Sequence, residues 1–293
     1  MIQRNNNLSV LPFYRSIAEQ SHRRSYAYGD VYPLYTPLGS VPPFQIIRQH
    51  NAATVADVFL HRVDGTFEDD VTGRMEESGL TVVQFSSDGY DIVVFPSRAP
   101  MNITPSVGQY YIILEMSDGM RYYSDVFTAV GAIDGYLSVQ WYDMVDLVME
   151  GSRIYYNGGL FRNQLWLATQ LGKPDYTFEE EGEQRDGLFF PEKQISAKTY
   201  KFTFLASEYL CDVMRFIRMS DVVTVRDQFG NEYPCDTFLM TPKWEAQGNL
   251  ASVEVEFTCD TVAKKIGHGW QNLGTLGDYN NDFNNDFDIT NNN

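Results

Sequence analysis

The sequence predicts a mainly β protein with two antiparallel β-sandwich or jelly-roll-like domains, an extended N-terminal arm and one short helix in the second domain. Short runs of β-branched and aromatic residues recur along the chain, as in Leu80–Phe85 and Tyr90–Phe95, and such runs are typical of strands. Aspartate–glycine pairs follow several of these runs, and this pair favours hairpin turns because its backbone tolerates positive φ. The pairs are Asp64–Gly65, Asp88–Gly89, Asp118–Gly119 and Asp134–Gly135.

Length and charge exclude several classes of protein. The 293 residues allow one large domain or two ordinary ones. With 22 Lys and Arg against 39 Asp and Glu, the net charge is −17, which argues against direct reading of nucleic acid and against docking on anionic lipid. Hydrophobic residues make up 43% of the chain, enough for packed cores. The apolar runs are too short to insert into a membrane.

The predicted organisation has four parts: an N-terminal extended arm over 1–48, a first β-sandwich domain over 49–131, a second β-rich domain over 132–266, and an Asn/Asp-rich tail over 267–293. Strands expected in the first domain are Thr54–Leu60, Leu80–Phe85, Tyr90–Phe95, Gly108–Met116 and Tyr122–Val130. Those expected in the second domain are Tyr136–Trp141, Gly151–Tyr156, Asn163–Ala168, Lys198–Leu205, Val222–Arg226, a short strand from Glu232, Thr237–Thr241 and Ala251–Thr258.

The second domain also contains the one predicted helix, Ser207–Met219. Ser207 is a suitable N-cap, and Leu210, Met214 and Ile217 form an apolar stripe at helical spacing. In the last predicted strand, Val253, Val255 and Phe257 alternate with polar residues, which indicates one buried and one exposed face.

The N-terminal 48 residues differ from the rest in composition. Two helical turns are expected over Ser16–Arg24, but the prolines that follow oppose a helix and a central strand. The segment is also the one net-basic part of the chain. Two interpretations stay open: a disordered terminus, or an arm that binds an acidic neighbouring subunit through arginine and tyrosine. The candidate interface residues on this arm are Arg15, Arg23, Arg24, Tyr26, Tyr28, Tyr32 and Tyr35.

A dense acidic segment is the second candidate interface. Its residues are Glu179, Glu180, Glu181 and Glu183. Paired carboxylates can hydrolyse glycosidic bonds when a cleft holds them at a fixed separation, but a run within one loop does not set that geometry. The sequence favours a solvated acidic loop, or a patch that receives a basic arm from another subunit.

No catalytic residue, cofactor site or metal site is predicted. Cys211, Cys235 and Cys259 match no common zinc or disulfide pattern and are expected to be reduced thiols in the core. The tail places oxygen donors at alternate positions from Asp278, but it lacks the glycine and glutamate of a calcium-binding loop. The N-terminus lacks the apolar region of a secretory signal, so we expect the protein to act where it is made or to leave by cell lysis.

Four stretches from about Tyr122 onward resemble tail-associated virion structural proteins of phages and prophages of Bacteroidetes. They are Tyr123–Thr128, Gly187–Gln194, Tyr209–Asp212 and Trp244–Val253. The organisation in two β-rich domains is similar to that of distal tail proteins, and a collar or tail-ring component of crAss-like phages is a second possibility. No functional residue is carried over, because these stretches match scaffold rather than a site.

The resemblance implies a non-enzymatic structural component of a bacteriophage virion, a tail or collar ring or hub subunit. It implies as partners copies of the chain itself and adjacent phage tail or collar proteins. The expected location is the tail region of the virion, after synthesis in the cytoplasm of the host bacterium. A carbohydrate-binding or adhesin-like β-sandwich module is the alternative, because exposed aromatic residues such as tryptophan can stack on sugars. A hydrolase built on the acidic segment is the third hypothesis.

Overall fold

The computed structural model describes residues 9–21, 34–85, 89–96, 102–144, 148–150, 153–155, 161–245 and 249–265. Contacts between residues divide the chain into two units. Unit 1 comprises Met1–Pro174 and Tyr200–Cys259, and unit 2 comprises Asp175–Thr199 and Asp260–Asn293.

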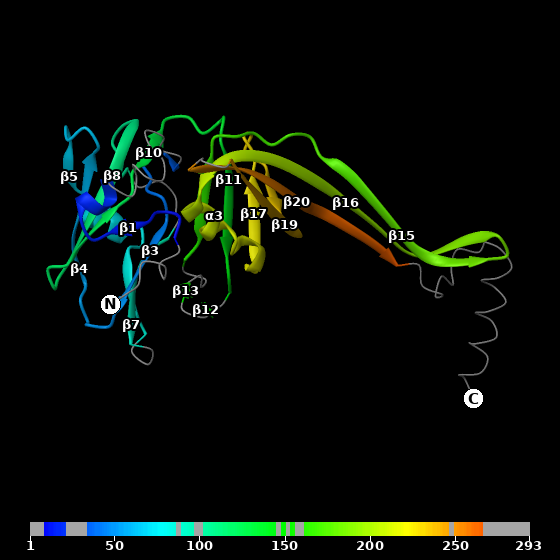
Figure 1. Cartoon of the computed structure of the whole chain (residues 1–293), viewed down its shortest axis with the longest axis horizontal. Coiled ribbons are helices and arrows are strands. Elements are labelled where there is room, and N and C mark those ends of the chain that lie inside the picture. Colours follow the sequence, from blue (N-terminus) through cyan, green and yellow to red (C-terminus); the bar gives the residue numbers. More distant parts are fainter. Residues whose placement is uncertain are drawn as a thin grey trace. The chain divides into compact units, whose positions relative to one another are not determined.

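Unit 1 contains most of the helices and strands (Figure 1). Its first half holds β1 (Phe13–Tyr14), β2 (Tyr35–Pro37), β3 (Phe44–Gln49), β4 (Val55–Arg62), β5 (Glu68–Asp70), α2 (Thr72–Glu77), β6 (Thr81–Phe85), β7 (Tyr90–Phe95), β8 (Gly108–Met116), β9 (Arg121–Ser124) and β10 (Phe127–Val130). Its second half holds β11 (Leu137–Tyr142), β12 (Val148–Glu150), β13 (Arg153–Tyr155), β14 (Asn163–Leu167), α3 (Glu208–Met214), the 3-10 helix η2 (Ile217–Met219), β17 (Val222–Arg226), β18 (Glu232–Pro234) and β19 (Thr237–Trp244).

The remaining strands are β15 (Asp175–Arg185) in unit 2, and β16 (Leu188–Ser207) and β20 (Leu250–Lys265), whose residues belong partly to each unit. The predicted mainly β fold with antiparallel sheets is therefore confirmed. The helix predicted over Ser207–Met219 is also found, divided into α3 and η2, and the Ser207 hydroxyl accepts a hydrogen bond from the Leu210 amide (3.2 Å) as the predicted N-cap.

The largest sheet has eleven strands in the order β1-β9-β8-β10-β2-β14-β11-β17-β18, with β4 paired to β8 and β5 to β4. A three-stranded sheet has the order β3-β7-β6, and a four-stranded sheet has the order β15-β16-β20-β19. Within the largest sheet, β2 pairs in parallel with β10 and antiparallel with β14. These two pairings connect strands from both predicted domains into one sheet.

One apolar core runs through unit 1 and includes side chains from Val10 to Cys259. Near its N-terminal end, the Phe44 ring packs on Phe13 and Phe95, with ring centroids 4.7 and 5.4 Å apart. Near its C-terminal end, Phe257 packs against Tyr200 at 5.4 Å. Val253, Val255 and Phe257, which were predicted to form the inward face of β20, are buried as expected.

This core changes the interpretation of the N-terminal residues. The structure does not place the described residues of the predicted arm apart from the sandwich: Val10, Leu11 and Leu34 are buried, and β1, β2 and β3 each pair with other strands. The prolines still limit these strands, because β1 and β2 are only two and three residues long. The four-part organisation with boundaries after residues 48, 131 and 266 stays a prediction.

The predicted aspartate–glycine turns differ from the expected geometry. Gly65 and Gly119 have positive φ (73° and 80°), but Asp64 and Asp118 do not, so neither pair forms the type I′ turn. The Asp186–Gly187 pair, which was not predicted as a turn, has positive φ at both residues (50° and 81°). This is the type I′ conformation, and it joins β15 to β16.

In unit 2, β15 and β16 form a long antiparallel hairpin, drawn in yellow-green in Figure 1. The register shifts between Glu181 and Gly182, which is a β-bulge. A Cβ atom on Gly182 would lie 2.1 Å from the Phe190 carbonyl oxygen. Since the obstructing atom belongs to the backbone, only glycine fits at this position.

We predict that Gly182→Ala opens the part of the hairpin beyond the bulge, because the added methyl group overlaps the Phe190 carbonyl. Hydrogen–deuterium exchange of backbone amides between the bulge and the turn should become roughly tenfold faster or more. Gly172→Ala is the matched control, since nothing lies within 4 Å of its Cβ position. Unchanged exchange in Gly182→Ala would contradict the described bulge.

We predict that Phe257→Ala lowers the free energy of unfolding by about 3–5 kcal/mol, because it leaves a cavity in the core of unit 1. Chemical denaturation measures this change. Phe229→Ala is the control: the Phe229 side chain is 80% exposed, and its loss should cost less than about 0.5 kcal/mol. Equal effects of the two substitutions would show that Phe257 is not in the core.

Candidate interaction surface

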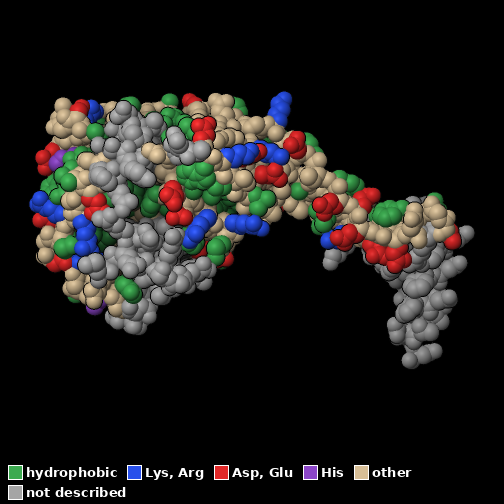
Figure 2. Space-filling model, viewed as in Figure 1, with side chains coloured by type: hydrophobic (Ala, Val, Ile, Leu, Met, Phe, Trp, Pro, Cys, Tyr) green, Lys and Arg blue, Asp and Glu red, His purple; other side chains and the backbone are tan. Residues whose placement is uncertain are grey.

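Large apolar side chains lie exposed on the β15–β16 hairpin, which spans residues 175–199. Tyr176 is 74% exposed and Phe178 is 63% exposed, and both lie on the same face of β15 because they are two residues apart. Leu188, Phe189 and Phe190 follow the turn and are also exposed. Figure 2 shows hydrophobic and acidic side chains next to one another over these strands. We call the exposed side chains of residues 175–199 the hairpin surface.

The predicted acidic residues all lie on this hairpin, but in a strand and not in a loop. Glu179, Glu180, Glu181 and Glu183 are exposed residues of β15. Glu181 forms an ion pair with Lys193 (3.6 Å), and Glu180 accepts a hydrogen bond from the Gln194 amide (2.6 Å). The regular strand spaces these carboxylates along an open edge, and no cleft encloses them among the described residues.

The structure describes two of the predicted arm residues, Arg15 and Tyr35. Arg15 is exposed. Tyr35 is half-buried in β2, where its ring packs against that of Tyr136 (5.1 Å). Tyr35 is thus part of the largest sheet, because β2 fits between β10 and β14. The other five arm residues lie outside the described residues: Arg23, Arg24, Tyr26, Tyr28 and Tyr32.

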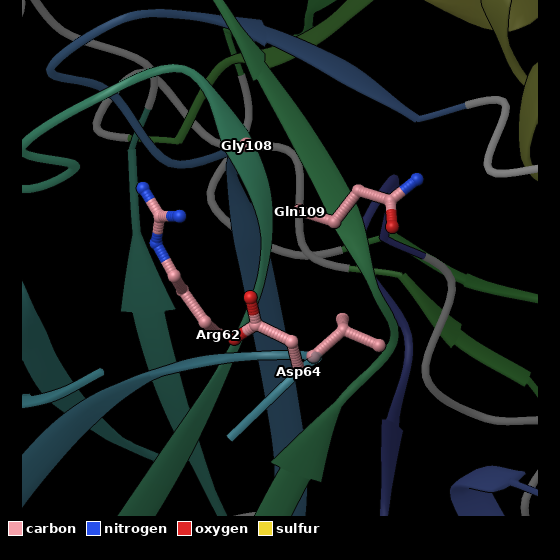
Figure 3. Close-up of a pocket in the computed structure, with 5 residues that line it drawn as sticks. Arg62, Asp64, Gly108 and Gln109 are labelled. Carbon is pink, nitrogen blue, oxygen red and sulfur yellow. The ribbon is translucent and has the colours of Figure 1, made fainter. Parts of the chain in front are cut away.

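A pocket of about 350 Å³ in unit 1 is lined by Arg62, Val63, Asp64, Gly108 and Gln109. In Figure 3, the Arg62 and Gln109 side chains point away from each other. The Arg62 guanidinium donates hydrogen bonds to the Ser106 and Tyr110 hydroxyls. Hydrogen bonds from the side chain and backbone of Thr66 lower the pKa of Asp64. Both charged groups are therefore already engaged within the fold.

The three cysteines lie in the core of unit 1 or pack against it. All three are free thiols, with Cys211 and Cys259 buried. Burial raises the pKa of Cys211 to about 11 and that of Cys235 to about 12. These thiols are protonated near neutral pH, and a protonated thiol is a poor nucleophile.

The other candidates for chemistry are dispersed. In the described residues, no three His, Cys, Asp or Glu side chains lie close enough to hold a metal ion. Trp141 and Trp166 are buried, whereas Trp244 is about half exposed, so Trp244 is the described tryptophan that a sugar ring can reach. The oxygen-rich tail from Asp278 lies outside the described residues.

The turn that carries the exposed Phe229 is stabilised by the buried carboxylate of Asp227. Asp227, in the turn between β17 and β18, accepts hydrogen bonds from the Phe229 and Asn231 amides (2.9 and 2.8 Å) and from the Tyr233 hydroxyl (3.1 Å). Phe229 lies at the tip of this turn. Burial alone would raise the pKa of Asp227, but the hydrogen bonds from Asn231, Phe229 and Tyr233 outweigh it and hold this pKa below the ordinary value of an aspartate.

We predict that Asp227→Asn lowers the free energy of unfolding at pH 7 by about 1–3 kcal/mol, because charge-assisted hydrogen bonds are lost. The depressed pKa means that the carboxylate stabilises the fold above the usual pKa of aspartate, and that this contribution disappears as the pH falls through the folded-state pKa. The difference between wild type and variant should therefore be constant above about pH 5 and shrink below about pH 4.

Denaturation curves at several pH values measure this difference. Asp134→Asn is the control, because Asp134 is exposed, and it should change stability by less than about 0.5 kcal/mol. A difference between wild type and Asp227→Asn that is independent of pH would contradict the role of the Asp227 charge.

No helix in the described part of the chain is both long and apolar enough to cross a membrane. Comparison of the sequence with protein-family models and with curated proteins gives no match.

Proposed function

We propose that this protein is a structural component of a bacteriophage virion, a tail or collar ring or hub subunit that assembles with copies of itself and with neighbouring tail or collar proteins. In this proposal the chain is made in the cytoplasm of the host bacterium and resides in the tail region of the particle. In this role the protein binds other subunits, which requires complementary surfaces and no active site.

The observation that carries the proposal is the hairpin surface. Exposed large apolar side chains mark sites of association, and the hairpin carries two groups of them: Tyr176 and Phe178 on β15, and Leu188, Phe189 and Phe190 after the turn. Part of the hairpin, Gly187–Gln194, is also one of the four stretches that resemble virion proteins. The mainly β fold of unit 1 is compatible with this role, but many other functions use such folds.

Charge distribution supports contacts between different surfaces of neighbouring copies. Residues 1–48 carry five arginines against Glu19 and Asp30, a net charge of +3, so the remaining residues carry −20. A closed ring uses heterologous interfaces, in which one patch binds a different patch on the next copy. A basic patch and an acidic patch on each copy satisfy this requirement.

We predict that the purified chain forms a closed oligomer, with a mass in solution that is a whole multiple of 33.5 kDa and ring-shaped particles in electron micrographs. Arg23→Glu combined with Arg24→Glu should weaken assembly roughly tenfold, because the reversed charges repel the acidic surface. Sedimentation over a range of concentrations measures this change.

Arg218→Glu is the matched control for charge reversal. Arg218 is an exposed arginine of η2, outside the proposed contact, and its reversal should leave assembly unchanged. A wild-type chain that stays monomeric at high concentration would overturn the proposed function. In that case, binding on a glycan array would favour the carbohydrate-binding alternative.

A further inference from the structure

The hairpin surface has a property that an ordinary surface hairpin lacks: it has almost no core of its own. Among the described side chains of residues 175–199, only Ala197 and Thr199 are buried. Strands that lack a packed hydrophobic face are marginally stable in water. The apolar side chains that would normally stabilise it, such as Tyr176 and Phe178, point into solvent instead. The hairpin therefore gains stability when another surface covers these side chains.

The exposed aromatic residues have the composition of interface anchors. Tyr176 and Phe178 are neighbours on one face of β15, opposite the short or polar partners Lys198 and Ser196 on β16. Tyrosine and phenylalanine are enriched in the buried centres of interfaces, where polar residues surround them. The glutamates of β15 provide such a polar rim, because Glu180 continues the same face beyond Phe178.

The charge of the hairpin defines the chemistry of its partner. Residues 175–199 contain seven acidic and three basic residues, a net charge of −4. Two of the basic residues are already engaged, Lys193 with Glu181 and Lys198 with Asp260. A partner that covers Tyr176 and Phe178 is therefore complementary when it brings positive charge close to Glu180, which lies on the same face of β15.

The same charge disfavours pairing of two hairpins through identical edges. β15 is the outermost strand in the order β15-β16-β20-β19. Two copies of β15 placed side by side would bring their glutamates together, and like charges across a strand pair are destabilising. We therefore expect the partner of the β15 edge to be a basic segment and not the β15 strand of a second copy.

The net-basic N-terminal region of this chain contains a segment of that kind. The ten residues from Arg15 to Arg24 carry three arginines against Glu19, and Arg15 is exposed. Arg48, farther along the net-basic region, is buried and paired with Asp118, so it does not contribute.

We propose that the hairpin surface docks the stretch Arg15–Arg24 of a second copy of this chain, with Tyr176 and Phe178 as apolar anchors and the β15 glutamates as the charged rim. This inference rests on the proposed function, because it requires that copies associate, and it identifies the contact by which they do so.

The experiment tests the anchors and the occupant separately. The double variant Tyr176→Ser/Phe178→Ser should weaken self-association by about 30-fold or more, as the loss of interface anchors does. Phe229→Ser removes an equally exposed aromatic residue from another turn, and it should assemble like wild type. Circular dichroism of the monomeric fractions verifies that both variants are folded.

A photo-reactive benzoylphenylalanine at position 178 identifies the occupant. In a mixture of isotopically light and heavy copies, cross-links should join position 178 of one copy to residues 15–24 of another, and mass spectrometry locates them. The Tyr176→Phe variant, which keeps the aromatic ring, should assemble and cross-link like wild type.

The outcomes separate this inference from the proposed function. If the wild-type chain forms oligomers but the serine variants assemble equally well, or the cross-links fall within one copy or outside residues 15–24, the inference is overturned and the proposed function stands. If the wild-type chain does not associate, the proposed function is wrong. The inference that a second copy binds the hairpin surface is then wrong as well.

Discussion

A large, continuous apolar core determines most of the architecture of unit 1. It joins side chains that are far apart in the sequence, from Val10 to Cys259, and the largest sheet crosses the middle of the chain through β2, β10 and β14. Because such long-range burial is the main favourable contribution to folding, the two sequence halves of unit 1 share their stabilisation. This explains why short strands such as β1 and β2 persist between prolines.

Aromatic side chains are buried in the core of unit 1 but exposed on the hairpin surface. In unit 1, aromatic rings such as Phe257 are fully covered by the chain itself. On the β15–β16 hairpin, rings of similar size lie in solvent beside carboxylates. Apolar area that the chain leaves uncovered is available to drive association, so the proposed structural role follows from where this sequence does not bury its aromatic residues.

Sequence patterns predicted strands well where one face is buried and the other is polar. β8, β11 and β20 show this alternation, and their inward residues, such as Val139 and Val255, are in the core. β15 was not predicted, because the run of glutamates favoured a loop over the alternating pattern of Tyr176 and Phe178. The Asp186–Gly187 pair was the one local pattern that indicated the turn after this strand. β2 and β3 could not be predicted from local pattern, since their pairing with β10 and β7 is a tertiary effect that overrides proline content.

The charged edge of β15 also has a consequence for the handling of this protein. Electrostatic repulsion helps to keep the open strand from joining other copies through its backbone, because Pro and a short length, two other common protections of an edge, are absent from β15. Such protection depends on the solvent: concentrated salt screens it and acid neutralises it. The colloidal solubility of the chain should thus be governed by ionic strength and acidity well before the fold of unit 1 is affected.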